Sequence, residues 1–249
     1  MNLNLPYDLP DFVKVVNRIK ESISKHEKVV VYGDYDVDGL TSTAIMVKTL
    51  LQLGLKSGYF IPSRYHEGYG LCISRVEDFI KKGYQTIITV DNGISAFEAI
   101  DYAKSKGLEV IVIDHHEIQE KLPNTDYIFH QNLSGFIDYN CSAASLAFFV
   151  CSYLLGGFDY YLATMAGIAV FSDVMPLIGN NLELAKISLF AMKKFRYPNL
   201  ISLNTSDEIS YDYYSFVLIP SLNSVGRILT DTLATNAACK FLIYPDQPD

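Results

Sequence analysis

Short apolar runs alternate with amphipathic stretches along the first half of the chain. The runs at residues 28–32, 59–61, 86–90 and 110–113 are rich in β-branched and aromatic residues, which favour strands. A fifth run at residues 127–129 has the same character. Runs without polar alternation are typical of strands that are covered on both faces. The pattern therefore predicts five strands in a sheet that is buried between two layers.

Amphipathic helical stretches separate these runs, at residues 41–53, 74–82 and 95–106, and each is followed by a glycine. Strands that alternate with helices of this length indicate βαβ units, whose strands are parallel. We therefore expect an α/β fold with a mostly parallel five-stranded sheet flanked by helices.

The pattern becomes helical after about residue 140. Helices are predicted at residues 142–155, 160–171, 182–195 and 232–243. We expect an α/β core over about residues 26–180, followed by a helical C-terminal segment over about residues 181–249.

The composition is that of a globular protein. Of 249 residues, 49% are hydrophobic and 19% are charged, which excludes a disordered or collagen-like chain. No apolar run reaches the roughly 18 residues of a membrane span, and the N-terminus lacks the pattern of a signal peptide. The four cysteines form no CxxC motif, which argues against a zinc site or a disulfide framework. We expect a cytoplasmic protein that does not associate with membranes.

The formal net charge is −8. A protein that holds nucleic acid mainly through phosphate contacts usually presents a basic face, and the chain as a whole has no such excess of basic residues. Either its partner is not a long polyanion, or binding is local, depends on a metal ion, or uses another part of the protein.

Three aspartates cluster in Gly33-Asp-Tyr-Asp-Val-Asp-Gly39, directly after the first strand. Carboxylates this close repel one another and raise one another's pKa, so a cation usually offsets them. An EF-hand calcium loop would need a glutamate at its twelfth position, where this sequence has Ile45. A divalent metal site and an acidic surface turn remain as interpretations.

Two further polar motifs follow predicted strands. Asp91-Asn-Gly93 follows the third strand, and Asp114-His-His-Glu117 follows the fourth. Taken alone, the first is ordinary turn chemistry and the second is more often structural than a set of ligands. The carboxyl ends of parallel strands, however, share the edge of the sheet at which α/β proteins bind ligands.

The side chains expected to converge there are Asp34, Asp36, Asp38, Asp91, His115 and His116. Several carboxylates with one or two imidazoles suit Mn²⁺ or Mg²⁺ better than Zn²⁺. A carboxylate shared between two such ions is the arrangement that transfers a phosphoryl group to water. Asp173, which follows an apolar helix, is either an ordinary helix-end residue or a further member of this cluster.

A receiver or nucleotide-binding domain would also carry acidic residues at strand ends. The chain, however, contains neither GxGxxG nor GxxxxGK[ST], the glycine-rich loops that hold phosphates. Such a domain would also leave the adjacent His115 and His116 unexplained. No Ser-His-Asp or Cys-His arrangement argues for a covalent nucleophile.

In this order the motifs resemble the DHH phosphoesterase superfamily, and most closely its RecJ branch of bacterial exonucleases specific for single-stranded DNA. The triplet Asp114-His115-His116 matches the sequence that gives the superfamily its name. The segments that match the RecJ branch are residues 33–42, 64–70, 91–94, 114–116, 172–177 and 220–227. The resemblance covers nearly the whole chain.

The resemblance implies that two Mn²⁺ or Mg²⁺ ions bind to this chain. Asp36 and Asp38 would bind the two ions separately, with Asp34 as a further ligand or just behind the ligands. Asp91 would bridge the ions.

The resemblance also implies roles for the remaining matching positions. His115 and Asp173 would complete one metal site, and His116 would contact the scissile phosphate. The residues that would hold or line the substrate are Arg64, Asn223 and Arg227.

The sequence departs from the family in three respects. A segment that is usually glycine-rich reads Cys141-Ser-Ala-Ala-Ser145, which keeps small side chains but has less backbone freedom. Ser221 stands where the family often has arginine, which weakens the expected grip on the substrate. Family members also continue into a second, DHHA1-type domain and often an OB-type domain. We therefore expect either a fragment or a naturally short relative.

The function that the resemblance implies is metal-dependent hydrolysis of single-stranded DNA from the 5′ end, in DNA repair and recombination. A single-strand-binding protein or a helicase is the implied protein partner. The enzymatic alternative is a DHH-family hydrolase of short oligoribonucleotides, 3′-phosphoadenosine 5′-phosphate or cyclic dinucleotides. The non-enzymatic alternative is a DHH-like scaffold that has lost catalysis, as in the eukaryotic replicative helicase.

Overall fold

Five strands form one sheet in the computed structural model, in the order β2-β1-β3-β4-β5. The structure describes residues 2–63, 70–133, 135–136, 140–203, 208–228 and 232–246. The strands are β1 (Val29–Tyr32), β2 (Gly58–Phe60), β3 (Thr86–Val90), β4 (Glu109–Asp114) and β5 (Tyr127–His130). Every neighbouring pair is parallel, which confirms the predicted α/β fold.

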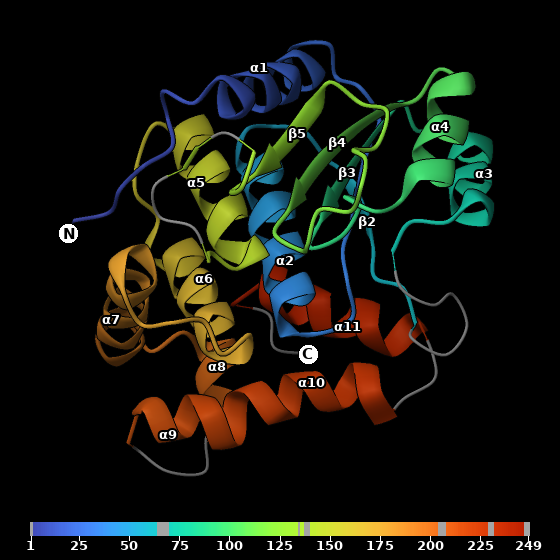
Figure 1. Cartoon of the computed structure of the whole chain (residues 1–249). Helices are drawn as coiled ribbons and strands as arrows, with labels where there is room; N and C mark the ends of the chain where they lie inside the picture. The colour runs from blue at the N-terminus through green and yellow to red at the C-terminus, as the bar shows by residue number, and fades with distance from the viewer. Residues whose placement is uncertain are drawn as a thin grey trace.

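Helices flank this sheet and continue beyond it (Figure 1). Those of the first half are α1 (Pro10–Ser24), α2 (Val37–Gln52), α3 (Ile73–Lys81), α4 (Phe97–Ser105) and α5 (Ala143–Leu155). The rest are α6 (Tyr160–Ser172), α7 (Gly179–Phe195), α8 (Pro198–Ser202), α9 (Tyr211–Tyr213), the π-helical turn η1 (Tyr214–Leu218), α10 (Ile219–Ile228) and α11 (Thr232–Ile243). Each predicted helix is present, whereas α1 and the segment from α8 to α10 were not predicted.

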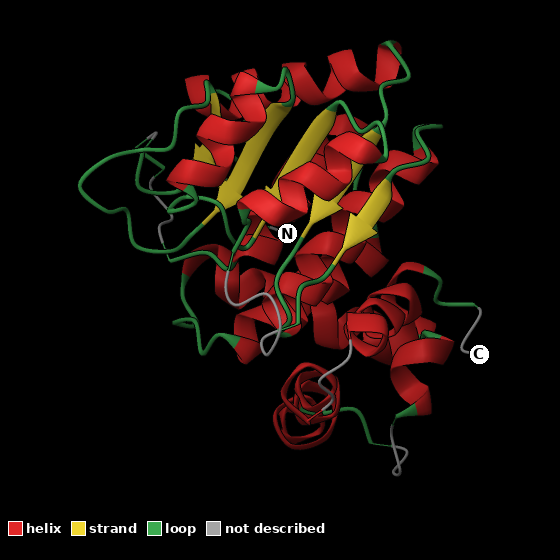
Figure 2. Cartoon of the chain, turned by 90° about the vertical axis from the view of Figure 1, so that its right-hand side faces the viewer, coloured by secondary structure: helices red, strands yellow, loops and turns green. Residues whose placement is uncertain are grey.

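Different helices bury the two faces of the sheet. Alternate side chains of β1 point to opposite faces, so Val29 and Val31 pack with α1, α2 and α5, whereas Val30 and Tyr32 pack with α3 and α4. Figure 2 shows the strands lying between these two helical layers. Burial on both faces explains why the strands read as uninterrupted apolar runs.

The helix α1 packs on the α2 and α5 face of the sheet, at the edge strand β5. Its apolar side chains Phe12, Val15, Val16 and Ile19 recur at helical spacing and are all buried. The ring of Phe12 meets that of Phe129 on β5 edge to face, with 5.2 Å between centroids. The sequence therefore carries a helical pattern here, although no helix was predicted.

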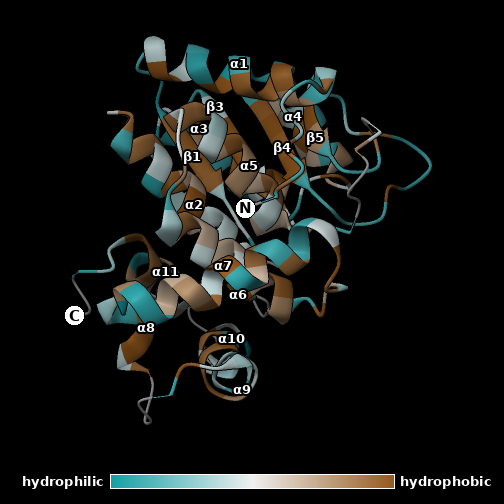
Figure 3. Cartoon of the chain, turned by 90° about the vertical axis from the view of Figure 1, so that its left-hand side faces the viewer, coloured by the Kyte–Doolittle hydropathy of each residue, from teal (hydrophilic) through white to brown (hydrophobic). Residues whose placement is uncertain are grey.

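The core continues from α2 and α5 into α6, α7 and α11, and Figure 3 shows the apolar character of the strands at its centre. Helices α6 and α7 lie so close together that a Cβ atom on Gly167 would be 2.4 Å from Cβ of Ser188. Within the described residues, no helix is both long enough and apolar enough to cross a membrane.

Residues 211–228, which we call the α10 arm, run along the outside of this helical layer (Figure 1). Near its start, the rings of Tyr211 and Tyr214 pack on Phe171 of α6 at centroid distances of 5.2 and 5.7 Å. Near its end, a Cβ atom on Gly226 would lie 2.5 Å from the carbonyl oxygen of Tyr35, in the loop after β1. The arm therefore joins α6 to the first acidic loop.

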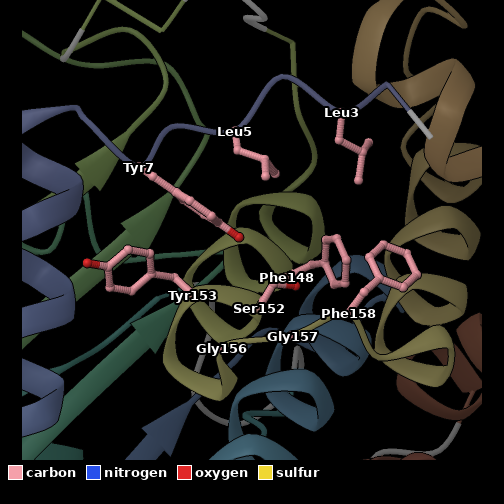
Figure 4. Close-up of a pocket in the computed structure, with 9 residues that line it drawn as sticks. All are labelled: Leu3, Leu5, Tyr7, Phe148, Ser152, Tyr153, Gly156, Gly157 and Phe158. Carbon is pink, nitrogen blue, oxygen red and sulfur yellow. The ribbon is translucent and has the colours of Figure 1, made fainter.

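An apolar cavity of about 430 Å³ lies between the N-terminal segment and the end of α5. Figure 4 shows Leu3, Leu5 and Tyr7 on one side of it and Phe148 and Phe158 on the other. It lies near the C-terminal end of α5, a helix of 13 residues that is about 20 Å long. Asp38 contacts the opposite end of this helix, so the cavity is separate from the predicted metal site.

A buried arginine ties α1 to the start of β3. Arg18 is only 7% exposed. Its guanidinium donates hydrogen bonds to Ser22 Oγ at 2.7 Å and to Thr86 Oγ1 at 3.1 Å. It also forms an ion pair with Glu27 Oε2 at 3.0 Å, and the Glu27 side chain is 11% exposed.

We expect Arg18→Met to lower the free energy of unfolding by about 3–5 kcal/mol, because it leaves the carboxylate of Glu27 without its buried cation. As a control, Lys25→Ala removes the exposed ion pair with Glu21 and should change stability little. Urea unfolding of both variants measures the difference. Equal losses in the two variants would contradict the structural role of Arg18.

Candidate metal centre

The predicted site lies between β1 and β3, where the order of strands in the sheet reverses direction. From β1 the sheet extends through β2 on one side and through β3, β4 and β5 on the other. In α/β sheets this reversal opens a crevice beyond the carboxyl ends of the strands. Asp34 follows β1, Asp91 follows β3 and His115 follows β4 at this edge.

The first acidic loop turns directly into α2, four residues earlier than predicted. Asp36 caps the helix, because its Oδ1 accepts a hydrogen bond from Gly39 N at 3.0 Å. Gly39 has no room for a side chain, since a Cβ atom there would lie 2.4 Å from the carbonyl oxygen of Asp34. Asp38 therefore lies in the first turn of α2 rather than in a loop.

Asp38 is inaccessible to water and is held by the start of another helix. Its two carboxylate oxygens accept hydrogen bonds from Ala143 N and Ala144 N of α5, each at 2.7 Å. The N-terminus of a helix offers unpaired N–H groups and a partial positive charge, both of which favour a carboxylate. The small residues of the segment Cys141–Ser145 thus bind a side chain of the protein itself.

His115 stands among three carboxylates from three different elements. Its Nε2 atom is 3.2 Å from Asp91 Oδ1, 3.5 Å from Asp38 Oδ2 and 3.5 Å from Asp173 Oδ2. Asp173 reaches this position from the C-terminal end of α6, where it is the capping residue. The structure therefore joins Asp173 to the residues at the sheet edge.

Asp114 orients the loop instead of joining the cluster of carboxylates, a role that the sequence did not assign. Its oxygens accept hydrogen bonds from Ile94 N at 2.9 Å, His115 N at 2.8 Å and His116 N at 3.2 Å. Its Oδ1 also lies 2.8 Å from Nδ1 of the His116 ring. The signal in the sequence was an aspartate placed directly before two histidines at a strand end.

The pairing of Asp114 with His116 shifts both groups toward their charged forms. Burial disfavours the charge of Asp114, but hydrogen bonds from the His116 ring and from backbone N–H groups outweigh it, so the pKa of Asp114 is below its usual value. Burial also disfavours a charged His116, but the bond to Asp114 outweighs it and raises the His116 pKa. His116 is thus a partly exposed residue beside the cluster whose charged form is favoured by Asp114.

Burial and mutual repulsion disfavour the charged forms of four further aspartates. Burial, followed by repulsion from Asp36, raises the pKa of Asp34 and of Asp38 to about 7. Burial and the charges of Asp38 and Asp36 raise the pKa of Asp173 to about 8. The pKa of Asp91 is raised well above its usual value by burial and neighbouring aspartates. A bound cation would relieve this repulsion.

The arrangement fits two adjacent divalent cations. Three sets of potential ligand atoms each lie within 4.8 Å of one another: Asp34, Asp36 and Asp91; Asp38, His115 and Asp173; and Asp91, His115 and His116. Within the described part of the chain, Asp34 Oδ1 and His115 Nε2 are buried and form no hydrogen bond. Buried polar atoms normally have a partner, so these two are positioned for an ion. Carboxylates with one or two imidazoles suit Mn²⁺ or Mg²⁺.

Besides His116, three residues are predicted to bind or line the substrate, and two of them lie on the α10 arm. Asn223 contacts the backbone of the acidic loop, because its Oδ1 accepts a hydrogen bond from Val37 N at 3.1 Å. Arg227 is exposed one turn further along α10. Arg64 lies outside the described residues.

The model of the DHH family's N-terminal domain matches residues 28–170. The chain belongs to the DHH family. The matched region contains all five strands and the loops that carry Asp34, Asp36, Asp91 and His115. The motif resemblance is thereby confirmed.

Relatives of known activity are longer than this chain. The single-stranded-DNA-specific exonuclease RecJ of Bacillus subtilis is 35% identical over 230 residues, which are 90% of this chain and 29% of the relative. The protein of the same name from Haemophilus influenzae is 32% identical over 251 residues, which are 90% of this chain and 43% of the relative. The chain thus spans less than half the length of either.

Solved RecJ structures share the fold. The crystal structure of exonuclease RecJ bound to manganese superposes with a TM-score of 0.85 and 28% identity, covering 96% of this chain and 62% of that chain. RecJ from Thermus thermophilus in complex with Mn²⁺ gives a TM-score of 0.84 and 25% identity, covering 99% of this chain and 36% of that chain. Both confirm the parallel sheet and its flanking helices.

We expect the stability of the metal-free protein to fall as the pH rises from about 4 toward 8. Folded Asp34, Asp38 and Asp173 keep protons up to about pH 7 or 8 that the unfolded chain loses near pH 4, so deprotonation favours unfolding. Mn²⁺ replaces these protons, so it should raise the melting temperature more at pH 8 than at pH 6. Thermal unfolding with and without Mn²⁺ measures this, and an equal Mn²⁺ effect at both pH values would contradict it.

We expect Asp91→Asn to weaken Mn²⁺ binding more than about tenfold. Substituting a residue that only supports a metal ligand already lowers metal affinity by about 10–100-fold, so substituting a ligand should lower it at least as much. Asp91 has a φ of 62°, a left-handed conformation that asparagine tolerates, so the backbone should be preserved. Because the buried charge is removed, the metal-free variant should melt above the metal-free wild type. Calorimetry and thermal unfolding measure both effects, with the exposed Asp101→Asn as the matched control. A variant that binds Mn²⁺ like the wild type would refute the assignment of Asp91.

Proposed function

We propose that this chain hydrolyses phosphodiester bonds of single-stranded DNA with two bound Mn²⁺ or Mg²⁺ ions, releasing nucleotides from the 5′ end. The observation that carries the proposal is the position of His115 Nε2, within 3.5 Å of the carboxylates of Asp91 after β3, Asp38 on α2 and Asp173 at the end of α6. Two adjacent sets of ligands meet there, and two ions side by side are the arrangement for phosphoryl transfer to water. The RecJ relatives, which are exonucleases specific for single-stranded DNA, support this substrate.

The residues divide into two ligand groups. Asp34, Asp36 and Asp91 would hold one ion. The residues that would hold the other are Asp38, His115 and Asp173. Bound ions supply Lewis acidity and a water molecule of lowered pKa. Asp91 of the first group lies 3.2 Å from His115 of the second, so the groups adjoin, and Asp91 would be the ligand that the two ions share.

His116 would bind the scissile phosphate. Its side chain is 42% exposed, and its ring is oriented by Asp114 at Nδ1. Because Asp114 raises its pKa, His116 can carry a positive charge and donate a hydrogen bond to a phosphate oxygen. This places a proton donor beside the carboxylates, where negative charge develops during the reaction.

The remaining substrate contacts would come from Arg64, Asn223 and Arg227. The Oδ1 atom of Asn223 is engaged by Val37 N, which leaves its amide NH₂ group to donate to a phosphate. Arg227, one turn along α10, would neutralise a neighbouring phosphate. From the resemblance to the RecJ exonucleases we also propose that the protein acts in the cytoplasm in DNA repair and recombination, together with a single-strand-binding protein or a helicase.

The activity test uses single-stranded oligonucleotides protected by phosphorothioate linkages at either the 5′ or the 3′ end, with Mn²⁺. We expect mononucleotide release that 5′ protection stops, that 3′ protection leaves unchanged, and that Asp91→Asn reduces at least about 100-fold, or roughly 2.7 kcal/mol of transition-state stabilisation. A duplex, a dinucleotide and a chelator serve as controls. Release from the 3′ end would refute the polarity, and hydrolysis of the dinucleotide alone would refute the exonuclease assignment.

A further inference from the structure

A third histidine lies directly behind the DHH triplet. His130 is the last residue of β5, and the register of the sheet places it opposite Asp114 on β4. It is fully buried and belongs to none of the sets of potential metal ligands in the described chain. Its function must therefore act through its neighbours.

Both ring nitrogens of His130 form hydrogen bonds to the backbone. Nδ1 accepts a hydrogen bond from Asn132 N at 3.1 Å, so this nitrogen carries no proton. The proton of the neutral ring is then on Nε2, which donates to the carbonyl oxygen of His116 at 2.8 Å. The hydrogen bond from Asn132 N therefore fixes the tautomer of His130, and that tautomer provides the N–H group that binds the His116 carbonyl oxygen.

His116 is thereby held on both sides. Asp114 binds its ring and its backbone N–H, and His130 binds its carbonyl oxygen. Gln131, the residue after His130, contacts the backbone of His115 in the same way. Gln131 accepts a hydrogen bond from Cys141 N at 2.6 Å and approaches the His115 carbonyl oxygen at 3.5 Å.

We propose that His130 is a positioning residue. It holds the peptide group between His116 and Glu117 and so anchors the backbone after the two DHH histidines, which keeps His115 Nε2 among the three carboxylates. The proposal rests on the metal centre of the proposed function. His115 Nε2 lies 3.2–3.5 Å from its three neighbours, so a shift of about 1 Å in this peptide would disrupt the ligand set.

Two substitutions separate the two contacts of His130. Glutamine can place its NH₂ group near the former Nε2 and donate to the His116 carbonyl oxygen. Asparagine is shorter and can place its oxygen near the former Nδ1, so it keeps only the bond from Asn132 N. We expect His130→Asn to weaken Mn²⁺ binding at least about tenfold and His130→Gln to stay within about threefold of the wild type.

Calorimetric titration with Mn²⁺ measures these affinities, and thermal unfolding confirms that each variant is folded at the titration temperature. Ser188→Ala is the control for the loss of a buried hydrogen bond, because this hydroxyl bonds to Thr164 O and Tyr214 Oη in the α6–α7 region. It should lower the melting temperature and leave the Mn²⁺ affinity unchanged. Folded variants in which asparagine binds Mn²⁺ like the wild type, or glutamine as weakly as asparagine, would overturn the proposal.

Nitrogen-15 NMR of the wild type tests the same inference without a substitution. In the metal-free protein we expect the His130 ring to carry its proton on Nε2, and a proton on Nδ1 would overturn the proposal. A wild type that binds no Mn²⁺ would refute both this inference and the proposed function. A wild type that binds Mn²⁺ but cleaves no DNA would refute the exonuclease alone.

Discussion

The carboxylate of Asp38 is the group on which the rest of the metal centre depends. It has no access to water, and its charge is offset by two N–H groups at the start of α5. These bonds join segments 105 and 106 residues apart in the chain and fix the relative position of α2 and α5 where both begin. His115 and Asp173 then face a carboxylate that cannot move, so the ligand geometry is set before any ion binds.

The fold was readable because its strongest signals are local. The strands β1, β3 and β4 are largely continuous apolar runs, and a glycine follows each of the helices between them. Once the strands were taken as parallel, Asp34, Asp91 and His115 had to share one edge. The convergence of these residues therefore followed from chain order alone, before any contact was known.

What the sequence could not supply are contacts between distant segments. The helix α2 begins at Val37 because Asp36 caps it and Asp38 finds its partner on α5, and neither fact is visible in the apolar pattern. Asp114 belongs to the DHH triplet in the sequence, but in the structure its hydrogen bonds are to backbone N–H groups and to the ring of His116. His130 carried no pattern at all, since a single buried histidine at a strand end is ordinary in any core.

The π-helical turn η1 sets the rotation of everything that follows it on the α10 arm. Tyr214, at its start, is anchored by Ser188 and by the ring of Phe171, while Asn223 and Gly226 must meet the acidic loop. Each residue of an α-helix turns the chain by about 100°, and a π-helical turn spends an extra residue in completing one turn. An arm of the same length that was α-helical throughout would therefore present Asn223 roughly a quarter turn away from Val37. The number of residues in this segment, and not only their identity, thus determines whether the start of the arm can contact α6 and α7 while its end contacts the acidic loop.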